Sequence, residues 1–309
     1  MLEELFVQTL NGIYYGSILF MIASGMTVIL GILGILNLAH GELYAIGAYT
    51  TTSVLGYVVG ISPPLSTPFG TAAFVFLVIS GCFVASLLLL PIGAIIERVL
   101  MKPIYDRHEL YQLLATFGLL FVLTDAIRFI WGERPVSVSG VYSPLSFSAI
   151  PVGEFQYPFY NVLVIVTAFA LFGLLLYFFS YTKYGRIIRA TAINREMATA
   201  IGINQNRVFT AIFALGAFLA GFGGAIFVPP TAANLDMGTT PLILSFVIIV
   251  IGGLGSIRGA FAAAMIVGLL SRWATWLYPQ FEIAAPFAIM IAILLFKPEG
   301  LFGTWSELS

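Results

Sequence analysis

Residues 32–49 read ILGILNLAHGELYAIGAY, and this stretch decides how the chain can cross or enter a membrane. It interrupts long apolar runs with Asn37, His40 and Glu42, the densest polar cluster in any hydrophobic region of the sequence. Three glycines punctuate the same region: Gly31, Gly34 and Gly41. Ionisable groups inside a membrane are costly unless they face a cavity or a partner, so the stretch indicates a helix break or a re-entrant segment.

A second glycine-interrupted region lies in the other half of the chain, and its glycines follow an apolar run: Gly252, Gly253, Gly255 and Gly259. Two such regions are typical of transport pathways built on inverted repeats, although the internal similarity does not establish a repeat here. We therefore expect a substrate pathway that involves these residues: Asn37, His40, Gly41, Glu42, Gly253 and Gly255. The alternative is that Asn37, His40 and Glu42 hydrogen-bond the broken backbone and fix the fold.

The composition is that of an integral membrane protein. Of 309 residues, 60% are hydrophobic and 9% are charged, and the mean hydropathy is +1.03. Soluble domains are about a quarter charged, so lipid must be much of the solvent of this chain. The apolar runs approach the ~20 residues of a spanning helix, and the alternation of a β-barrel is absent. We expect an all-α polytopic helical bundle that forms a single domain over residues 1–309.

The bundle is expected to have about eight or nine transmembrane helices. The candidate spans are about 5–30, 41–60, 70–97, 110–130, 159–180, 208–228, 241–256, 259–277 and 283–297. Nine full passes fit the sequence. Eight passes plus a broken or re-entrant segment, around 23–42 or 241–260, fit it equally well.

Lysine and arginine are distributed unevenly among the connecting segments. Five of them occupy loop 181–207 and three occupy turn 98–107, whereas loop 131–158 has only Arg134. The positive-inside rule places 98–107 and 181–207 in the cytoplasm, and loop 131–158 outside as an ordered cap or docking surface. With nine passes the N-terminus lies outside, and the C-terminus, with Lys297, lies in the cytoplasm.

The sequence lacks the motifs of common catalytic and metal sites. None of its three lysines completes a phosphate loop, and its two histidines, His40 and His108, lie far apart. The net charge of −1 argues against a nucleic-acid partner. We expect no enzyme activity, no metal site and no cofactor bound by this chain. Cys82 is expected to be a buried thiol, and Asp125 and Arg128 are expected to pair across one helical turn.

Two arginines lie close to the ends of later spans. Arg258 follows the second glycine cluster and is expected to anchor the chain at the inner surface, with a gating role as the alternative. Arg272 has Trp273 and Trp276 nearby, which is typical of an interfacial belt.

Residues 194–202, NREMATAIG, form a polar stretch inside loop 181–207. Residues 192–201 are good helix formers and end at a glycine, which predicts a helix of about 10 residues, too short to be stable alone in water. Such a helix needs a partner surface. We expect Met197, Ala198 and Ile201 to fit a groove on a soluble protein. Two charged residues are expected at the rim: Arg195 and Glu196. The alternative is an ordinary solvated connector helix.

The same stretch carries a resemblance to a known motif. Glu196, Met197 and Ala198, followed after three residues by Gly202, resemble the E-A-A-x-x-x-G coupling loop of ABC importer permeases. Methionine stands at position 197 where that motif has alanine, and the I-x-L-P that follows the motif does not occur here. Residues 197–204, MATAIGIN, are similar to the MA-x-x-LGIN of permeases for branched-chain amino acids.

Three further stretches resemble that family. Residues 32–49 resemble its N-F-A-H-G-E signature, with Leu38 in place of phenylalanine. Residues 247–270, VIIVIGGLGSIRGAFAAAMIVGLL, resemble its second glycine-rich signature. Residues 295–303, LFKPEGLFG, resemble its R-P-x-G-L-x-G tail, with Lys297 in place of arginine. The chain is identified as a member of the branched-chain amino acid ABC permease family, nearer to its shorter LivH-type subunit than to the longer LivM-type partner.

The resemblance implies an assembly in the bacterial inner membrane. A second permease, LivM-like or another copy of this chain, completes the pathway. Two cytoplasmic ATP-binding subunits hydrolyse ATP with Mg²⁺, and a periplasmic binding protein delivers substrate. Six residues would contact the ATPases: Arg195, Glu196, Met197, Ala198, Ile201 and Gly202.

The implied substrates are branched-chain or hydrophobic amino acids, or similar small amides or carboxylates. The alternative function is an ion-coupled secondary transporter of small organic solutes, for which Glu42 and Asp125 are the candidate ion ligands.

Overall fold

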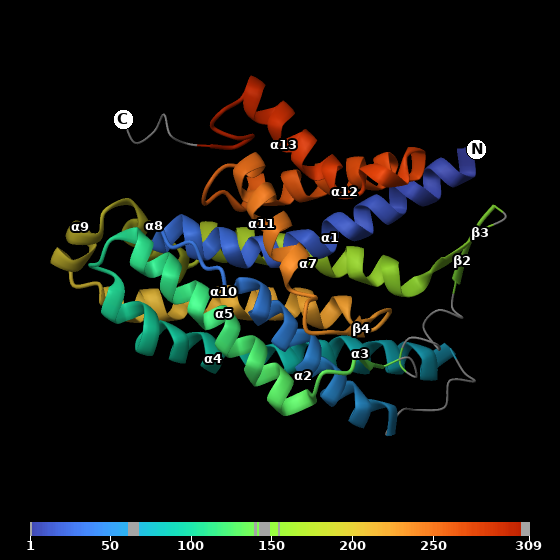
Figure 1. Cartoon of the computed structure of the whole chain (residues 1–309), viewed down its shortest axis with the longest axis horizontal. Helices are drawn as coiled ribbons and strands as arrows, with labels where there is room; N and C mark the ends of the chain where they lie inside the picture. The colour runs from blue at the N-terminus through green and yellow to red at the C-terminus, as the bar shows by residue number, and fades with distance from the viewer. Residues whose placement is uncertain (1, 61–67, 139–140, 142–148, 154, 304–309) are drawn as a thin grey trace.

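The structure is a computed structural model that describes residues 2–60, 68–138, 141, 149–153 and 155–303. It is a bundle built almost entirely of helices, as the sequence predicts (Figure 1). The α-helices are α1 (Leu2–Leu33), α2 (His40–Gly60), α3 (Pro68–Leu87), α4 (Leu89–Ile96), α5 (Glu109–Trp131), α7 (Phe159–Tyr181), α8 (Lys183–Ile193), α9 (Arg195–Ala200), α10 (Gln205–Phe227), α11 (Thr239–Gly252), α12 (Ile257–Leu277) and α13 (Ala284–Phe296). A π-helix, η1 (Glu97–Met101), and two short 3₁₀ helices, η2 (Lys102–Ile104) and η3 (Pro279–Phe281), complete the helical elements.

The strands are short and lie in the connections. Strand β1 (Val136–Ser137) pairs antiparallel with β4 (Ala232–Ala233), and β2 (Ala149–Val152) pairs antiparallel with β3 (Phe155–Pro158). Loop 131–158 was expected to form an ordered cap. Its strands and flanking residues lie within the described chain, and residues 139–140, 142–148 and 154 lie outside the described residues.

The described residues include six helices that are long and apolar enough to cross a membrane. They are Glu3–Leu33, Phe74–Ile104, Glu109–Trp131, Phe159–Tyr181, Gln205–Phe227 and Ile257–Leu277. Helices α11 and α13 are apolar but have only 14 and 13 residues. At 1.5 Å per residue each is about 20 Å long, against a hydrocarbon core of about 30 Å.

Helix α2 occupies an expected span but is not one of these six, because its sequence is too polar. All residues from 40 to 52 are buried inside the protein. Helix α10 packs along α2, and α3 and α5 also contact it. A helix that is enclosed by other helices does not meet lipid, so its side chains need not be apolar.

Close helix crossings hold the centre of the bundle together. Gly47 of α2 lies against the backbone of Gly221 in α10, and a Cβ at position 47 would overlap that backbone. Gly16 of α1 lies in the same way against Ala264 of α12. Small residues at such crossings let helix backbones approach closely, which is the main source of packing between helices in lipid.

The stretch 32–49 forms the predicted break. Helix α1 ends at Leu33, and Gly34 follows with φ of +71°. Asn37 Oδ1 accepts a hydrogen bond from the Ala39 N–H at 3.1 Å, so the chain turns there and α2 starts at once. His40 Nε2 lies 3.0 Å from the carbonyl oxygen of Ile22, in the middle of α1. Helix α2 therefore begins inside the bundle and not at its end.

The second glycine region also breaks the chain. Helix α11 ends at Gly252, and Gly253 and Gly255 both have positive φ, +95° and +79°. Ser256 then caps α12, because its Oγ accepts a hydrogen bond from the Gly259 N–H at 3.0 Å. The short α11 agrees with the expectation of a broken segment around 241–260.

The connections separate into two ends of the bundle. Helices α8 and α9 lie at one end, and the start of α1 lies with β2 and β3 at the opposite end (Figure 1). Turn 98–107 belongs to the α9 end, because the Tyr105 ring packs edge-on against Phe209 near the start of α10, with centroids 5.2 Å apart. Both basic segments therefore share one end of the molecule.

Candidate functional site

Helix α9 is a single short helix with a defined start and end. Asn194 ends α8 and caps α9, and its Oδ1 accepts a hydrogen bond from the Met197 N–H at 2.8 Å. Gly202 follows α9 with φ of +88°. Its N–H donates to the Thr199 carbonyl, and the Ile203 N–H donates to the Ala198 carbonyl, both at 3.0 Å. This pair of bonds is the Schellman ending that glycine permits.

The predicted end of this helix at Gly202 is confirmed, but the predicted start at 192 is wrong. Ala192 and Ile193 belong to α8, since Asn194 is extended, with φ of −148° and ψ of 103°. Two helices separated by one capping residue replace the single expected helix.

Large apolar side chains are exposed on α9 and at its two ends. Met197 is 61% exposed and Ile201 is 69% exposed, and Ile193 at the end of α8 is also exposed. Glu196 is exposed beside them. Ala198 is only 2% exposed and packs into its own chain, so the expectation that it faces a partner groove with Met197 is corrected. Successive helical residues differ by about 100° in direction, and the burial of Ala198 leaves Met197 facing outward.

Arg195 is bound to its own chain and not free at a rim. Its Nη2 donates a hydrogen bond to the carbonyl oxygen of Leu33, the last residue of α1, at 2.8 Å. The guanidinium also lies over the Phe209 ring, 5.1 Å from the centroid. The last carbonyls of a helix lack intrahelical partners and attract cations. Arg195 therefore ties α9 to the point where α1 ends and the break begins.

A buried carboxyl group lies close to the Arg195 contact, and no local pattern in the sequence indicates it. Glu97 of η1 is fully buried and accepts hydrogen bonds from the Tyr105 hydroxyl at 3.0 Å and from the Thr210 hydroxyl at 2.6 Å. Burial and the adjacent Glu97 carboxyl raise the pKa of the Tyr105 hydroxyl, so Tyr105 remains a hydrogen-bond donor. This network joins η1 to α10 next to the ring on which Arg195 rests.

The polar cluster of the first break is enclosed by protein. Asn37 and His40 have no exposed surface; Asn37 binds the Ala39 N–H within the break, and His40 lies against the Ile22 carbonyl oxygen of α1. Glu42 is 5% exposed, with Thr124 and Asp236 as polar neighbours. Each of the three keeps one buried atom without a partner in the described chain: Asn37 Nδ2, His40 Nδ1 and Glu42 Oε2. Asn37 therefore bonds the broken backbone, and His40 joins the start of α2 to α1.

The glycines of the expected pathway make close backbone contacts. Gly41 lies against Gly238, so the start of α2 meets the start of α11. Gly253 lies against Gly303. Gly255 lies against Gly31 and also lines a cavity of about 650 Å³ at the α9 end. Two arginines line the same cavity: Arg189 and Arg258.

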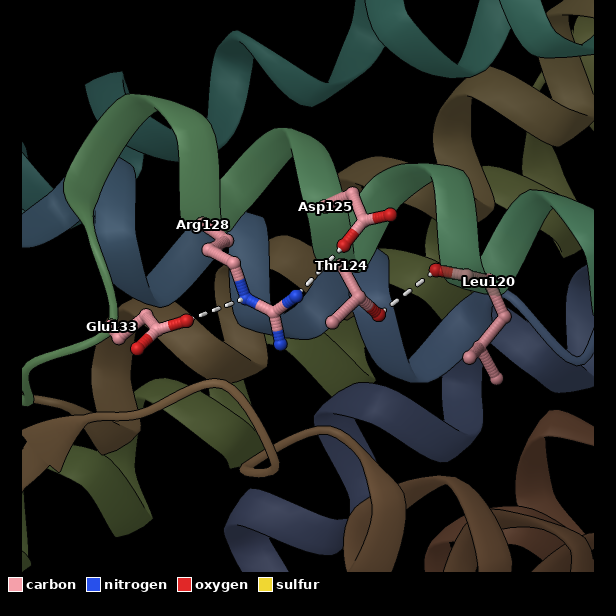
Figure 2. Close-up of polar contacts among 5 residues, drawn as sticks. All are labelled: Leu120, Thr124, Asp125, Arg128 and Glu133. Atoms are coloured by element: carbon pink, nitrogen blue, oxygen red, sulfur yellow. Dashed lines mark hydrogen bonds and ion pairs between the residues drawn. The ribbon is translucent and has the colours of Figure 1, made fainter.

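The expected pair on α5 is present. Figure 2 shows Arg128 between two carboxylates, with Nη1 3.1 Å from Asp125 and Nε 3.4 Å from Glu133. The contact with Glu133 was not expected from the sequence. All three side chains are at least half exposed. In the described residues no group of three or more His, Cys, Asp or Glu side chains is arranged to hold a metal ion. Cys82 is fully buried, as expected.

Known proteins resemble this chain over nearly its whole length. A family model described as "Branched-chain amino acid transport system / permease component" matches residues 8–295. The high-affinity branched-chain amino acid transport system permease protein LivH of Salmonella typhimurium is 30% identical over 305 residues, which cover 96% of this chain and 94% of that protein. The corresponding permease BraD of Pseudomonas aeruginosa is 30% identical, and the match covers 96% of this chain and 95% of that protein.

A more distant relative is the permease LivM of Escherichia coli, 25% identical over 311 residues that cover 96% of this chain and 69% of that protein. No solved structure matches the chain. The family model and the LivH and BraD relatives each cover almost all of the sequence, and so the chain belongs to the family of permease components of branched-chain amino acid transport systems.

Proposed function

We propose that this chain is a membrane-spanning permease subunit of a binding-protein-dependent ABC importer. It translocates branched-chain or other hydrophobic amino acids, or similar small amides or carboxylates. ATP and Mg²⁺ act in two separate ATPase subunits, and a second permease completes the pathway. The observation that carries this proposal is α9, a short capped helix with exposed Met197 and Ile201 that is tied through Arg195 to the end of α1.

In this proposal the α9 end faces the cytoplasm of a bacterium and the β2–β3 end faces the periplasm. The clustering of basic segments 98–107 and 181–207 at the α9 end supports that orientation. The start of α1 is then periplasmic, where a binding protein delivers substrate. The C-terminus is cytoplasmic, which agrees with the backbone bonds from Leu301 and Phe302 to the end of α11.

The proposed movement begins at α9. Closure of the ATPase pair displaces α9, and the Arg195–Leu33 bond transfers the displacement to the end of α1. The break that follows leads directly into α2, whose first turn carries Glu42. A small shift at the membrane surface is thereby carried into the middle of the bundle.

Docking of the ATPases tests this function. Met197→Asp and Ile201→Asp place charges on the exposed apolar face of α9, and we expect each to abolish co-purification of the ATPases while the permease still accumulates in the membrane. The matched control is Leu110→Asp, a 67% exposed leucine in the first turn of α5. Unimpaired ATPase binding by both α9 variants would rule out α9 as the docking helix.

The second candidate function is an ion-coupled secondary transporter. It is favoured by the buried Glu42, which lies near Asp236 and whose Oε2 has no partner in the part of the chain that the structure describes. It is disfavoured by Asp125, its other expected ion ligand, which already binds Arg128. Uptake driven by an ion gradient without ATP distinguishes it.

A further inference from the structure

A cavity of about 430 Å³ opens between α1, α11, α12 and α13. Tyr15 lines it from α1, 18 residues before Leu33, which places the cavity about 27 Å along α1 from the α9 end. Its volume lies within the ~300–1,000 Å³ of small-molecule sites. None of the pathway residues expected from the sequence lines it.

Arg272 supplies a free cationic group to this cavity. Its guanidinium lies over the Tyr15 ring, 4.5 Å from the centroid, which holds the side chain in place. Within the described chain the Arg272 guanidinium makes no hydrogen bond and no ion pair. Guanidinium N–H groups form a planar fork that matches a carboxylate with two parallel bonds. A partly buried arginine that is held on a ring, with its N–H groups free of acceptors in the described residues, is suited to bind an anionic group.

Ser271 adds a second unfilled hydrogen-bonding group. It is 5% exposed and lines the same cavity, and its Oγ has no hydrogen-bond partner among the described residues. Thr240, in the first turn of α11, lines the cavity as well. The N-terminal end of a helix carries partial positive charge. Ser271, Arg272 and the start of α11 together present hydrogen-bond donors and positive charge to one space.

Glu282 gives the cavity a negative charge at its exposed rim. Arg272 and Glu282 both lie close enough to Tyr15 to act on its hydroxyl, yet no ion pair joins them in the described residues. Opposite charges that line one cavity without binding each other suit a ligand that carries both charges itself. The remaining wall is largely apolar and includes Ile243, Leu244 and Phe287.

We propose that this cavity binds a free aliphatic amino acid as its zwitterion. The α-carboxylate binds Arg272 with Ser271 beside it, the ammonium group binds Glu282, and the aliphatic side chain packs on Ile243, Leu244 and Phe287. This inference rests on the proposed import function. It places a substrate-binding site on the permease itself, on the side opposite α9.

Thiol protection measures binding without requiring transport. The native thiol, Cys82, is fully buried, so Ser271→Cys adds one reactive site to the assembled transporter in lipid vesicles. We expect L-leucine to slow its modification by a small methanethiosulfonate reagent. Leucinamide lacks the carboxylate and 4-methylpentanoate lacks the amine, so each should need at least about tenfold higher concentration, because each loses a charge-assisted bond.

The matched control is Ser80→Cys, in a different cavity whose lining includes Phe83, Phe218 and no charged residue. Leucine should leave its modification unchanged. Equal protection of Ser271→Cys by leucine and both analogues, or none by leucine, would overturn the assignment. Protection by phosphatidylethanolamine vesicles and not by leucine would identify a lipid head group as the occupant and would also overturn it.

Substitutions in the cavity separate this proposal from the import function. Arg272→Gln should lower leucine uptake at least about tenfold, and Arg272→Lys should restore part of it. The control is Arg128→Gln, which removes an arginine outside the cavity and should leave uptake unchanged. If the unmodified transporter imports leucine and the Arg272→Gln variant imports it at the same rate, the cavity is not the binding site, while the proposed import function is retained. If leucine protects the thiol of Ser271→Cys but the transporter does not import leucine, the binding site is supported and the proposed import function is refuted. If Arg272→Gln does not accumulate, the thiol assay decides.

Discussion

The tie between Arg195 and the end of α1 is the contact whose loss should have the clearest effect. Arg195→Met keeps an unbranched side chain without the guanidinium, and it removes both the bond to the Leu33 carbonyl and the contact with the Phe209 ring. Because Arg195 is more than a third exposed, the lower ends of the usual ranges apply. These are about 1.5 kcal/mol for the charged hydrogen bond and about 0.5 kcal/mol for the cation–π contact.

The sum is about 2 kcal/mol, which corresponds to an about 30-fold lower population of the tied arrangement. Hydrogen–deuterium exchange of the permease in lipid discs measures this directly. Amides of 195–200 should exchange about 30-fold faster in Arg195→Met than in the unmodified protein. In the full transporter, the amount of leucine imported per ATP hydrolysed should fall, while ATPase binding persists.

The control for this variant is Arg186→Met. Arg186 is exposed on α8, and its side chain forms no hydrogen bond or ion pair in the described part of the chain. The reasoning is refuted if Arg195→Met exchanges at the same rate as Arg186→Met and imports as much leucine per ATP.

Three further substitutions test the surrounding structure. Asn194→Ala removes the cap of α9 and should destabilise that helix by about 1 kcal/mol, seen as faster amide exchange at 195–198; Asn194→Asp should restore the cap. Tyr105→Phe keeps the ring against Phe209 but leaves a Glu97 oxygen without its donor. It should lower the unfolding free energy by about 1–3 kcal/mol, measured by thermal unfolding. An unchanged unfolding free energy would contradict the proposed hydrogen-bond network. Gly47→Val should prevent the crossing of α2 and α10 and abolish the folded protein in membranes; normal yield would show that the crossing adapts.

Much of the fold could be predicted because its signals are local. The breaks at 34–39 and 253–256 follow from glycines that adopt positive φ in the structure, and Gly202 ends α9 for the same reason. Hydropathy predicted where most helices lie in the sequence, but it did not predict whether a helix faces lipid or other helices. Helix α2 fits an expected span, yet it is enclosed by other helices, and average hydropathy cannot tell a lipid-facing helix from an enclosed one.

The site was harder to predict because its contacts join distant parts of the chain. Arg195 binds a carbonyl 162 residues away, and no spacing in the sequence indicates that contact. The outward face of α9 depends on which side packs against the protein, and in a six-residue helix the sequence does not decide this for Ala198. Arg272 has the local surroundings of an interfacial residue, and only the approach of Tyr15 and Glu282 makes it part of a cavity.

The proposed import function is tested most directly by leucine accumulation in proteoliposomes. The vesicles contain this chain, its permease partner and both ATPases, with ATP inside and a substrate-loaded binding protein outside. We predict that leucine accumulates only when ATP and the binding protein are both present, and that Met197→Asp abolishes accumulation. Accumulation by this chain alone, driven by a proton or sodium gradient without ATP, would contradict the proposal and identify a secondary transporter.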